Sequence, residues 1–163
     1  MPQDHTTIDI RQLENAAFLP HVVALIHEGH TVTLPLRGRS MRPFLEDGRD
    51  KALLARADSV SVGDVVLAEL HRGHYVLHRV TQRDGDHLTL TGDGNLSDEH
   101  CLLSDVRAKA IAFYRKGRLQ ADTVSGVKWR LYSRLWVALR PLRRYLLFAL
   151  HPHIPTRFRK QIV

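Results

Sequence analysis

Apolar and polar positions alternate in short runs through the middle of the chain. Such alternation over about four to eight residues is typical of β-strands with one buried face. Gly73 and Gly85 lie between neighbouring runs, at the short spacing that β-hairpin turns require. We therefore predict antiparallel strands over residues 31–36, 51–55, 62–70, 75–82, 87–91 and 106–114.

Both ends of the chain show the longer period of helices. Residues 9–28 carry an apolar face, and Pro20 within them predicts a helix broken into two pieces. After Asp122, leucines recur at steps of three and four residues, which predicts one helical stripe, and Pro141 predicts a kink or a break in it. The leucines of this stripe are Leu131, Leu135, Leu139, Leu142, Leu146 and Leu150.

These patterns predict a mainly β protein. Strands joined by hairpins favour an open, coiled antiparallel β barrel over a parallel sheet. A helix precedes the barrel, and a basic amphipathic helical tail follows it. We divide the chain into an N-terminal helical segment (1–30), a β domain (31–122) and the tail (123–163).

The composition suits an ordinary globular protein. A length of 163 residues with 44% hydrophobic content fits one domain with one core. Cys101 is the only cysteine, which excludes an internal disulfide. We recognise no signal peptide and no apolar run of about 18 residues, so we expect no transmembrane helix. We expect a cytoplasmic protein, peripheral at the inner face of the membrane.

The charge is unevenly distributed along the chain. The net charge is +7, yet residues 123–163 hold nine Lys and Arg and no Asp or Glu, whereas residues 1–122 hold 15 basic and 17 acidic residues. A basic amphipathic tail suits the surface of an anionic membrane, but its leucine stripe also suits packing on the β domain or on a partner protein. Nucleic acid is not favoured, because the N-terminal helix is too short for a helix-turn-helix.

Three short motifs in the β domain carry candidate chemistry. Residues 38–43 place Ser40 between a glycine that permits positive φ and a proline that restricts the backbone before it. Such a sharp turn can present the hydroxyl to a substrate, and an ordinary turn has the same pattern. His78 follows 38 positions later, in a predicted strand. Residues 91–95 contain Asp93, in a sequence that also suits a simple turn.

These motifs and one further block resemble the signal peptidase I and LexA-like superfamily of serine peptidases over about residues 31–115. The matching blocks are Gly38-Arg39-Ser40-Met41-Arg42-Pro43, Gly63-Asp64-Val65-Val66, His78-Arg79-Val80 and Gly92-Asp93-Gly94-Asn95. The resemblance implies a serine endopeptidase that acts on a peptide or protein without a cofactor. Ser40 is then the nucleophile, and His78 replaces the lysine base of most bacterial members. An imidazole can accept the hydroxyl proton near neutral pH without burial.

The acid that supports His78 stays open between three residues. A histidine base usually needs an acceptor on its second ring nitrogen. The resemblance puts this acceptor at Asp93 or Asp98, and a shift of one residue puts it at Glu99 instead. The backbone N–H of Ser40 is the expected first donor of an oxyanion hole. Many bacterial signal peptidases add a serine two positions before the nucleophile, where this chain has glycine, so another backbone N–H or an arginine must supply the second donor.

Two other interpretations compete with a serine peptidase. His71, His74 and His78 could supply three nitrogens to a metal ion. The turn at Gly73 separates the first two, and no carboxylate base stands out near them, so we predict no metal site. The same fold without catalysis would be a peptide-binding or membrane-recruiting module.

Overall fold

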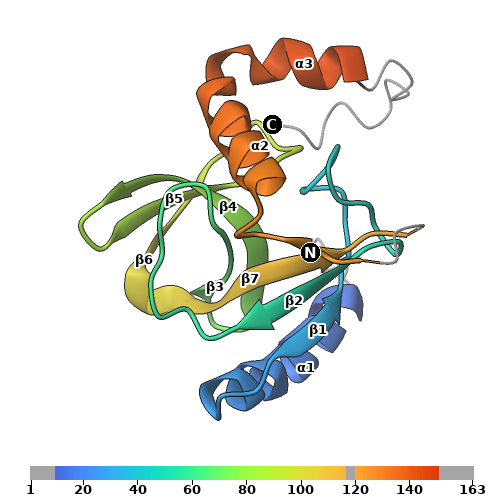
Figure 1. The fold of residues 1–163 in the computed structure, drawn as a ribbon. Coiled ribbons are helices and arrows are strands. Elements are labelled where there is room, and N and C mark those ends of the chain that lie inside the picture. Colours follow the sequence, from blue (N-terminus) through green and yellow to red (C-terminus); the bar gives the residue numbers. More distant parts are fainter. Residues whose placement is uncertain (1–9, 117–119, 151–163) are drawn as a thin grey trace, which may run out of the picture.

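A computed structural model describes residues 10–116 and 120–150 (Figure 1). The start of the N-terminal segment and the end of the tail, including Arg157, Arg159 and Lys160, lie outside the described residues. Eight strands form one sheet in the order β1-β2-β7-β3-β4-β5-β6, with β8 added to β7. The strands are β1 (Val32–Pro35), β2 (Lys51–Ala55), β3 (Val65–His71), β4 (His74–Asp84), β5 (His87–Thr91), β6 (Glu99–Leu102), β7 (Val106–Tyr114) and β8 (Asp122–Thr123).

The sheet is antiparallel and open. Every pair of neighbouring strands is antiparallel. The terminal strands β1 and β6 do not pair with each other in the described part of the chain, although the sheet curls strongly (Figure 1). The prediction of a mainly β, antiparallel and open architecture is therefore confirmed. Two of the eight strands, β6 and β8, were not predicted.

The central strand β3 separates two hydrophobic clusters, because successive side chains of a strand point to opposite faces. Val65 and Leu67 belong to the larger cluster, which also contains residues from α1 (Ile10–His27). Val66 and Ala68 belong to the smaller cluster, between β3, β4 and β5. Each face of the sheet therefore has its own core.

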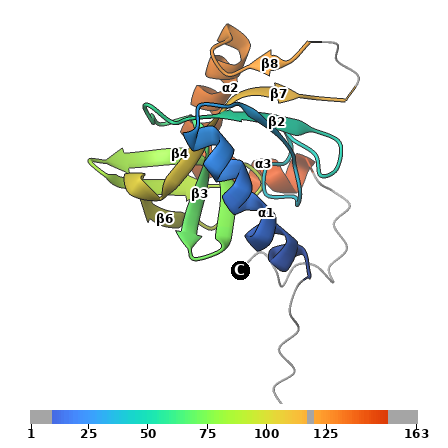
Figure 2. The same ribbon diagram turned by 90° about the horizontal axis from the view of Figure 1, so that it is seen from below.

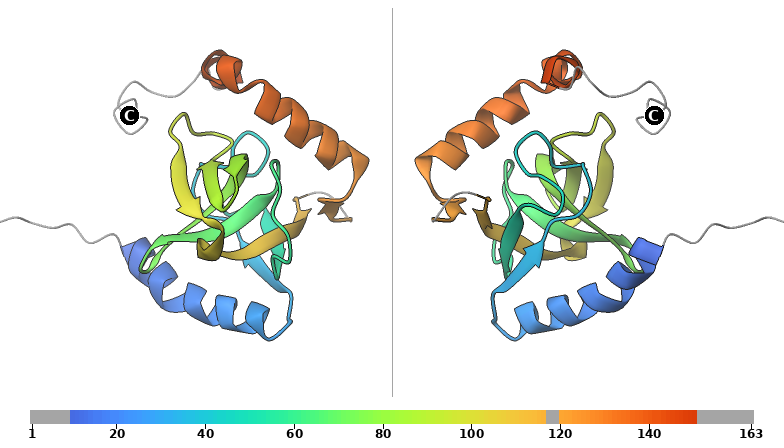
Figure 3. Two further views of the ribbon diagram at one scale, coloured as in Figure 1. Left: turned by 90° about the vertical axis from the view of Figure 1, so that its left-hand side faces the viewer. Right: turned by 90° about the vertical axis from the view of Figure 1, so that its right-hand side faces the viewer.

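Helix α1 is continuous through Pro20, so the prediction of two helical pieces is wrong. Proline removes one hydrogen bond of the helix, a loss that tertiary packing can offset. Leu19, Val22 and Ile26 are buried and hold this helix against the protein. Figures 2 and 3 show α1 on one side of the curled sheet and the C-terminal helices on another.

The tail consists of α2 (Val127–Ala138), the 3₁₀-helix η2 (Arg140–Leu142) and α3 (Arg143–Leu150). The break predicted at Pro141 is confirmed, since this residue lies in η2 between the two α-helices. Within α2 the leucine stripe faces solvent: Leu131 and Leu135 are exposed, whereas the helix buries Trp129, Ser133 and Trp136. No helix within residues 10–116 and 120–150 is both long and apolar enough to cross a membrane.

Candidate functional site

Ser40 lies in the turn that follows β1. Gly38 adopts a positive φ of 86°, as the sequence predicted, and reverses the chain just before the serine. Two hydrogen bonds shape the turn, from the Arg42 N–H to the Arg39 carbonyl oxygen at 3.1 Å and from the Leu45 N–H to the Met41 carbonyl oxygen at 3.0 Å. Met41 and Leu45 are buried in the larger cluster, while Ser40 is half-buried. The turn is therefore anchored by the core and presents its serine toward the surface.

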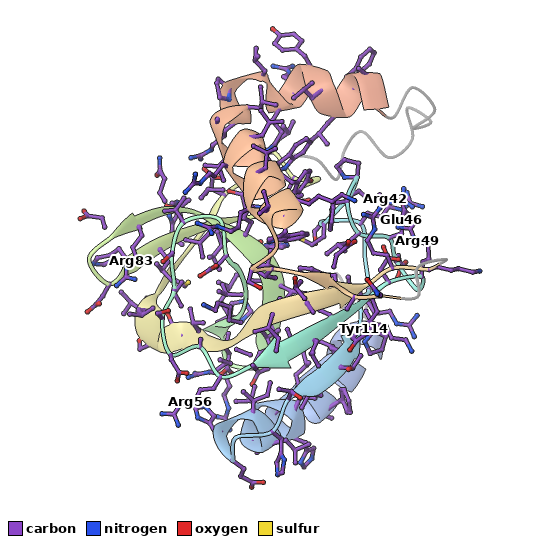
Figure 4. All side chains as sticks on the ribbon, in the orientation of Figure 1. Arg42, Glu46, Arg49, Arg56, Arg83 and Tyr114 are labelled. Atoms are coloured by element: carbon purple, nitrogen blue, oxygen red, sulfur yellow. The ribbon has the colours of Figure 1, made fainter. Side chains whose placement is uncertain are left out.

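The far end of the same loop is fixed by Asp50, whose role the sequence analysis missed. Its buried carboxylate accepts hydrogen bonds from the Glu46 N–H at 2.9 Å and from the Arg49 Nη2 at 2.6 Å. Burial acts to raise the pKa of Asp50, but these hydrogen bonds outweigh it and the pKa is lowered. Arg42 and Glu46 add an ion pair at 2.7 Å, and Figure 4 shows them beside Arg49 at this loop.

Residues 91–95 pack directly against the serine turn. The Gly94 N–H donates a hydrogen bond to the Ser40 carbonyl oxygen at 2.7 Å. A Cβ on Gly92 would lie 2.5 Å from that oxygen, and a Cβ on Gly94 would lie 2.9 Å from the Arg39 carbonyl oxygen. No side chain tolerates such distances to backbone, so both positions require glycine. The first and last blocks of the resemblance are thus in contact.

His78 points to the face of β4 that carries the smaller cluster, together with Val80. His78 is only 5% exposed, and its Nδ1 lies 2.5 Å from Glu99 Oε2. Glu99 is opposite Leu90 and Leu90 is opposite Val80, so side chains of three adjacent strands meet on one face. An ionised carboxylate can only accept a hydrogen bond, so a neutral imidazole paired with it carries its proton on Nδ1 and leaves Nε2 as an acceptor. Nε2 has no hydrogen-bond partner among the described residues.

Ser40 and His78 line the same cavity, which has a volume of about 180 Å³. Its other walls come from α1, β1, β3 and the first half of β4, and they include Leu19, Leu34 and Leu67. No hydrogen bond joins the two side chains in the described part of the chain. Such bonds are often long before substrate binds. Ser40 and His78 are thus both residues of the cavity wall, but the register of β4 directs the imidazole to the face of Val66 and Val80, opposite to that of Leu67.

Asp93 makes a different contact from the one the resemblance implied. Arg79, the neighbour of His78, faces the opposite side of β4 and is fully buried. Its Nε and Nη2 donate to the two oxygens of Asp93 at 2.8 and 2.7 Å, and its Nη1 donates to Gly63 O at 2.8 Å and to Ser133 Oγ at 2.6 Å. Burial acts to lower the pKa of Arg79, but the charge of Asp93 outweighs it and the pKa is raised.

Asp98 also lies away from the imidazole. It accepts a hydrogen bond from Thr91 Oγ1 at 2.6 Å and pairs with Arg140 of η2. Of the three acids considered from the sequence, Glu99 alone contacts His78 within the described residues. Neighbouring residues on an extended chain point to opposite sides, which is why a shift of one residue changes the partner.

Among the described residues, His71, His74 and Cys101 form no site of their own. The rings of His71 and His74 stack with centroids 4.5 Å apart, while His78 contacts Glu99. Within residues 10–116 and 120–150, no three His, Cys, Asp or Glu side chains are grouped so as to hold a metal ion. Burial raises the pKa of Cys101 to about 11, so this free thiol stays protonated near neutral pH.

Comparison with known proteins finds no match for this chain. The chain matches no protein-family model, no curated protein and no solved structure at a significant level. The resemblance to signal peptidases therefore rests on the residues of the chain itself, and the roles of Ser40, His78 and the acid are proposals.

Proposed function

We propose that the protein is a serine endopeptidase with a mechanism similar to that of signal peptidases. Ser40 Oγ attacks the carbonyl carbon of a peptide bond while His78 Nε2 accepts the hydroxyl proton. The imidazolium then gives this proton to the leaving amine, and the acyl group stays on Ser40 as an ester. A water molecule, deprotonated by the same ring, hydrolyses the ester and regenerates the serine.

The observation that carries this proposal is the environment of His78. The contact between Nδ1 and Glu99, at 2.5 Å, selects the tautomer in which Nε2 can accept a proton. Ser40 and His78 both belong to the wall of one cavity. Glu99, rather than Asp93 or Asp98, is the acid that we assign to the triad. Its negative charge stabilises the imidazolium that forms during attack.

Two backbone amides of the serine turn are suited to stabilise the oxyanion. The N–H groups of Ser40 and Met41 make no hydrogen bond with another described residue. Backbone donors held in place by a buried loop need no reorganisation when negative charge develops. We therefore assign the oxyanion to the Ser40 N–H, with the Met41 N–H as the candidate second donor.

The walls of the cavity favour a peptide with a small apolar side chain. About 180 Å³ lined largely by aliphatic groups accommodates one such side chain. Strand β1, which contributes Leu34 and Pro35 to the cavity, pairs only with β2 in the described sheet. An extended peptide can pair with the free edge of such a strand. The proposed substrate is therefore an extended segment with a small apolar residue beside the scissile bond.

A peptide-binding or membrane-recruiting module without catalysis is the competing function. It is favoured by the lack of a hydrogen bond between Ser40 and His78 in the described structure. Such a module would keep the cavity and the tail but would not activate the serine hydroxyl.

Labelling with a fluorophosphonate separates the two functions, because the reagent reacts only with an activated serine. We expect labelling of the wild type and of the control Ser104→Ala, which changes an exposed serine of the 3₁₀-helix η1 (Leu103–Asp105). We expect none for Ser40→Ala. Absence of labelling in the wild type, or equal labelling of Ser40→Ala, would support the binding module instead.

A further inference from the structure

Packing of α2 on the β domain leaves a row of large apolar side chains in solvent. Val127, Leu131 and Leu135 are exposed, whereas Trp129, Ser133 and Trp136 are buried. At about 100° per residue, the centres of these two sets lie roughly on opposite sides of the helix. The exposed row is therefore the outward side of α2.

Large apolar side chains are also exposed beyond Pro141, in η2 and α3. Figure 1 shows α3 running across the end of α2, away from the sheet. We call the six exposed residues of these helices the outer apolar face, and their side chains are between 52% and 82% exposed. The outer apolar face consists of Val127, Leu131, Leu135, Leu142, Tyr145 and Phe148.

The orientation of α2 is fixed by its buried side. Ser133 Oγ accepts a hydrogen bond from the buried Arg79 at 2.6 Å. The Trp129 ring lies 4.6 Å, between centroids, from both Phe44 and Phe113 of the β domain. Rotating α2 to bury the leucines would break these contacts and leave the arginine without one of its acceptors. The outer apolar face therefore stays outward in the folded protein.

Basic side chains border the outer apolar face on both sides. On the α2 wheel, Lys128 lies on one side of the row, and Arg130 and Arg134 lie on the other. These three side chains are exposed, and none forms an ion pair with another described residue. The sequence from residue 123 onward contains no Asp or Glu. Along α2 the surface is thus apolar at its centre and positive on both sides.

We propose that the outer apolar face binds an anionic lipid bilayer. The leucines and aromatic rings insert below the headgroups, and the basic border pairs with lipid phosphates. A second copy of the chain fits this surface poorly, because two faces with the same positive border would repel each other. An acidic partner protein would have to match both the apolar row and the border, whereas an anionic bilayer supplies both features at any orientation in its plane.

Vesicle sedimentation with the full chain tests this proposal. We expect binding to vesicles of phosphatidylcholine with about 30% phosphatidylglycerol, and weaker binding to pure phosphatidylcholine or at high salt. The double variant Leu131→Gln/Leu135→Gln should lower the partition coefficient at least about tenfold. The control Val62→Gln/Leu102→Gln changes two similarly exposed apolar residues of the β domain and should bind like the wild type. Circular dichroism confirms that both variants are folded.

Three results would overturn the proposal. The wild type could stay in the supernatant with anionic vesicles, or the leucine variant could bind as well as the wild type. Light scattering could instead show a dimer that the leucine substitutions dissociate, without lipid binding, which would assign the face to a second copy. Fluorophosphonate labelling of Ser40 in the leucine variant reports separately on the proposed peptidase, so failure of one proposal leaves the other testable.

Discussion

His78 and Arg79 are adjacent in β4, yet their surroundings differ in almost every respect. Arg79 is fully buried, and three of its nitrogens donate to Asp93, Gly63 and Ser133. His78 has one polar partner, Glu99, and its second ring nitrogen has none among the described residues. The alternation of the strand sends the Arg79 side chain under α2 and the His78 side chain to the face of the smaller cluster, beside Glu99.

This difference indicates that Arg79 contributes to the stability of the fold, whereas His78 suits reactivity. A buried charge must be fully paired, because an unpaired one costs several kcal/mol. A general base must keep one lone pair free for the proton that it will accept. The four hydrogen bonds of Arg79 therefore indicate a structural role, and the incomplete contacts of His78 suit catalysis. Substitutions of Asp93, Glu99 and Ser133 test these two roles, from the largest expected effect to the smallest.

Replacing Asp93 should have the largest effect on stability. Asp93→Ala leaves the Arg79 guanidinium buried without its counter-charge, and we expect a loss of about 3–5 kcal/mol in the free energy of unfolding. Urea denaturation measures this loss. Asp58→Ala is the matched control: its carboxylate is exposed beside Arg56 at 3.5 Å, and its loss should cost less than about 1 kcal/mol. Figure 4 shows Arg56 far from α2. Equal effects of the two substitutions would contradict the structural role of Asp93.

Replacing Glu99 should lower the reactivity of Ser40 and leave the stability of the fold nearly unchanged. Glu99→Gln removes the charge that holds the imidazole in its tautomer, and we expect the rate of fluorophosphonate labelling to fall about 10²-fold or more. Because Glu99 is half-buried at the end of the sheet, the free energy of unfolding should change by no more than about 1 kcal/mol. Asp98→Asn, one residue earlier, is the control and should retain most of the labelling rate. The reverse order would assign the acid to Asp98.

Replacing Ser133 should have the smallest effect. Ser133→Ala removes one acceptor from Arg79, which keeps Asp93 and Gly63, so we expect a loss of about 1–2 kcal/mol. Ser104→Ala, on an exposed serine, should be neutral, and both variants should label like the wild type. A loss of labelling in Ser133→Ala with unchanged stability would show that α2 influences the cavity directly.

The strands could be predicted where burial and sequence pattern agree. Residues 51–55, 87–91 and 106–114 were predicted with the observed bounds, because apolar side chains alternate and glycine turns delimit them. Strand β6 could not be predicted in this way. Its half-buried side chains are Glu99 and Cys101, whereas Leu102 is exposed, so the usual relation between polarity and burial is inverted.

Neither the buried side of α2 nor the acid that contacts His78 could be predicted from the sequence. Leucine spacing predicted the helices but not their buried side, because the packing side of α2 is selected by Arg79, Phe44 and Phe113 from distant parts of the chain. Hydropathy alone would predict that α2 buries its leucines and not the side that carries two tryptophans and a serine. The choice of Glu99 depended on strand register, which places it opposite Leu90 and hence on the face of His78. Such non-local contacts leave no local pattern.

Locating the fluorophosphonate adduct by mass spectrometry tests the central proposal most directly. The expected result is a single phosphonylated serine, Ser40, in the wild type, with no adduct formed on the same timescale in His78→Gln. An adduct on a different serine, or one that forms on Ser40 at the same rate without His78, would contradict the assignment of this pair as nucleophile and base.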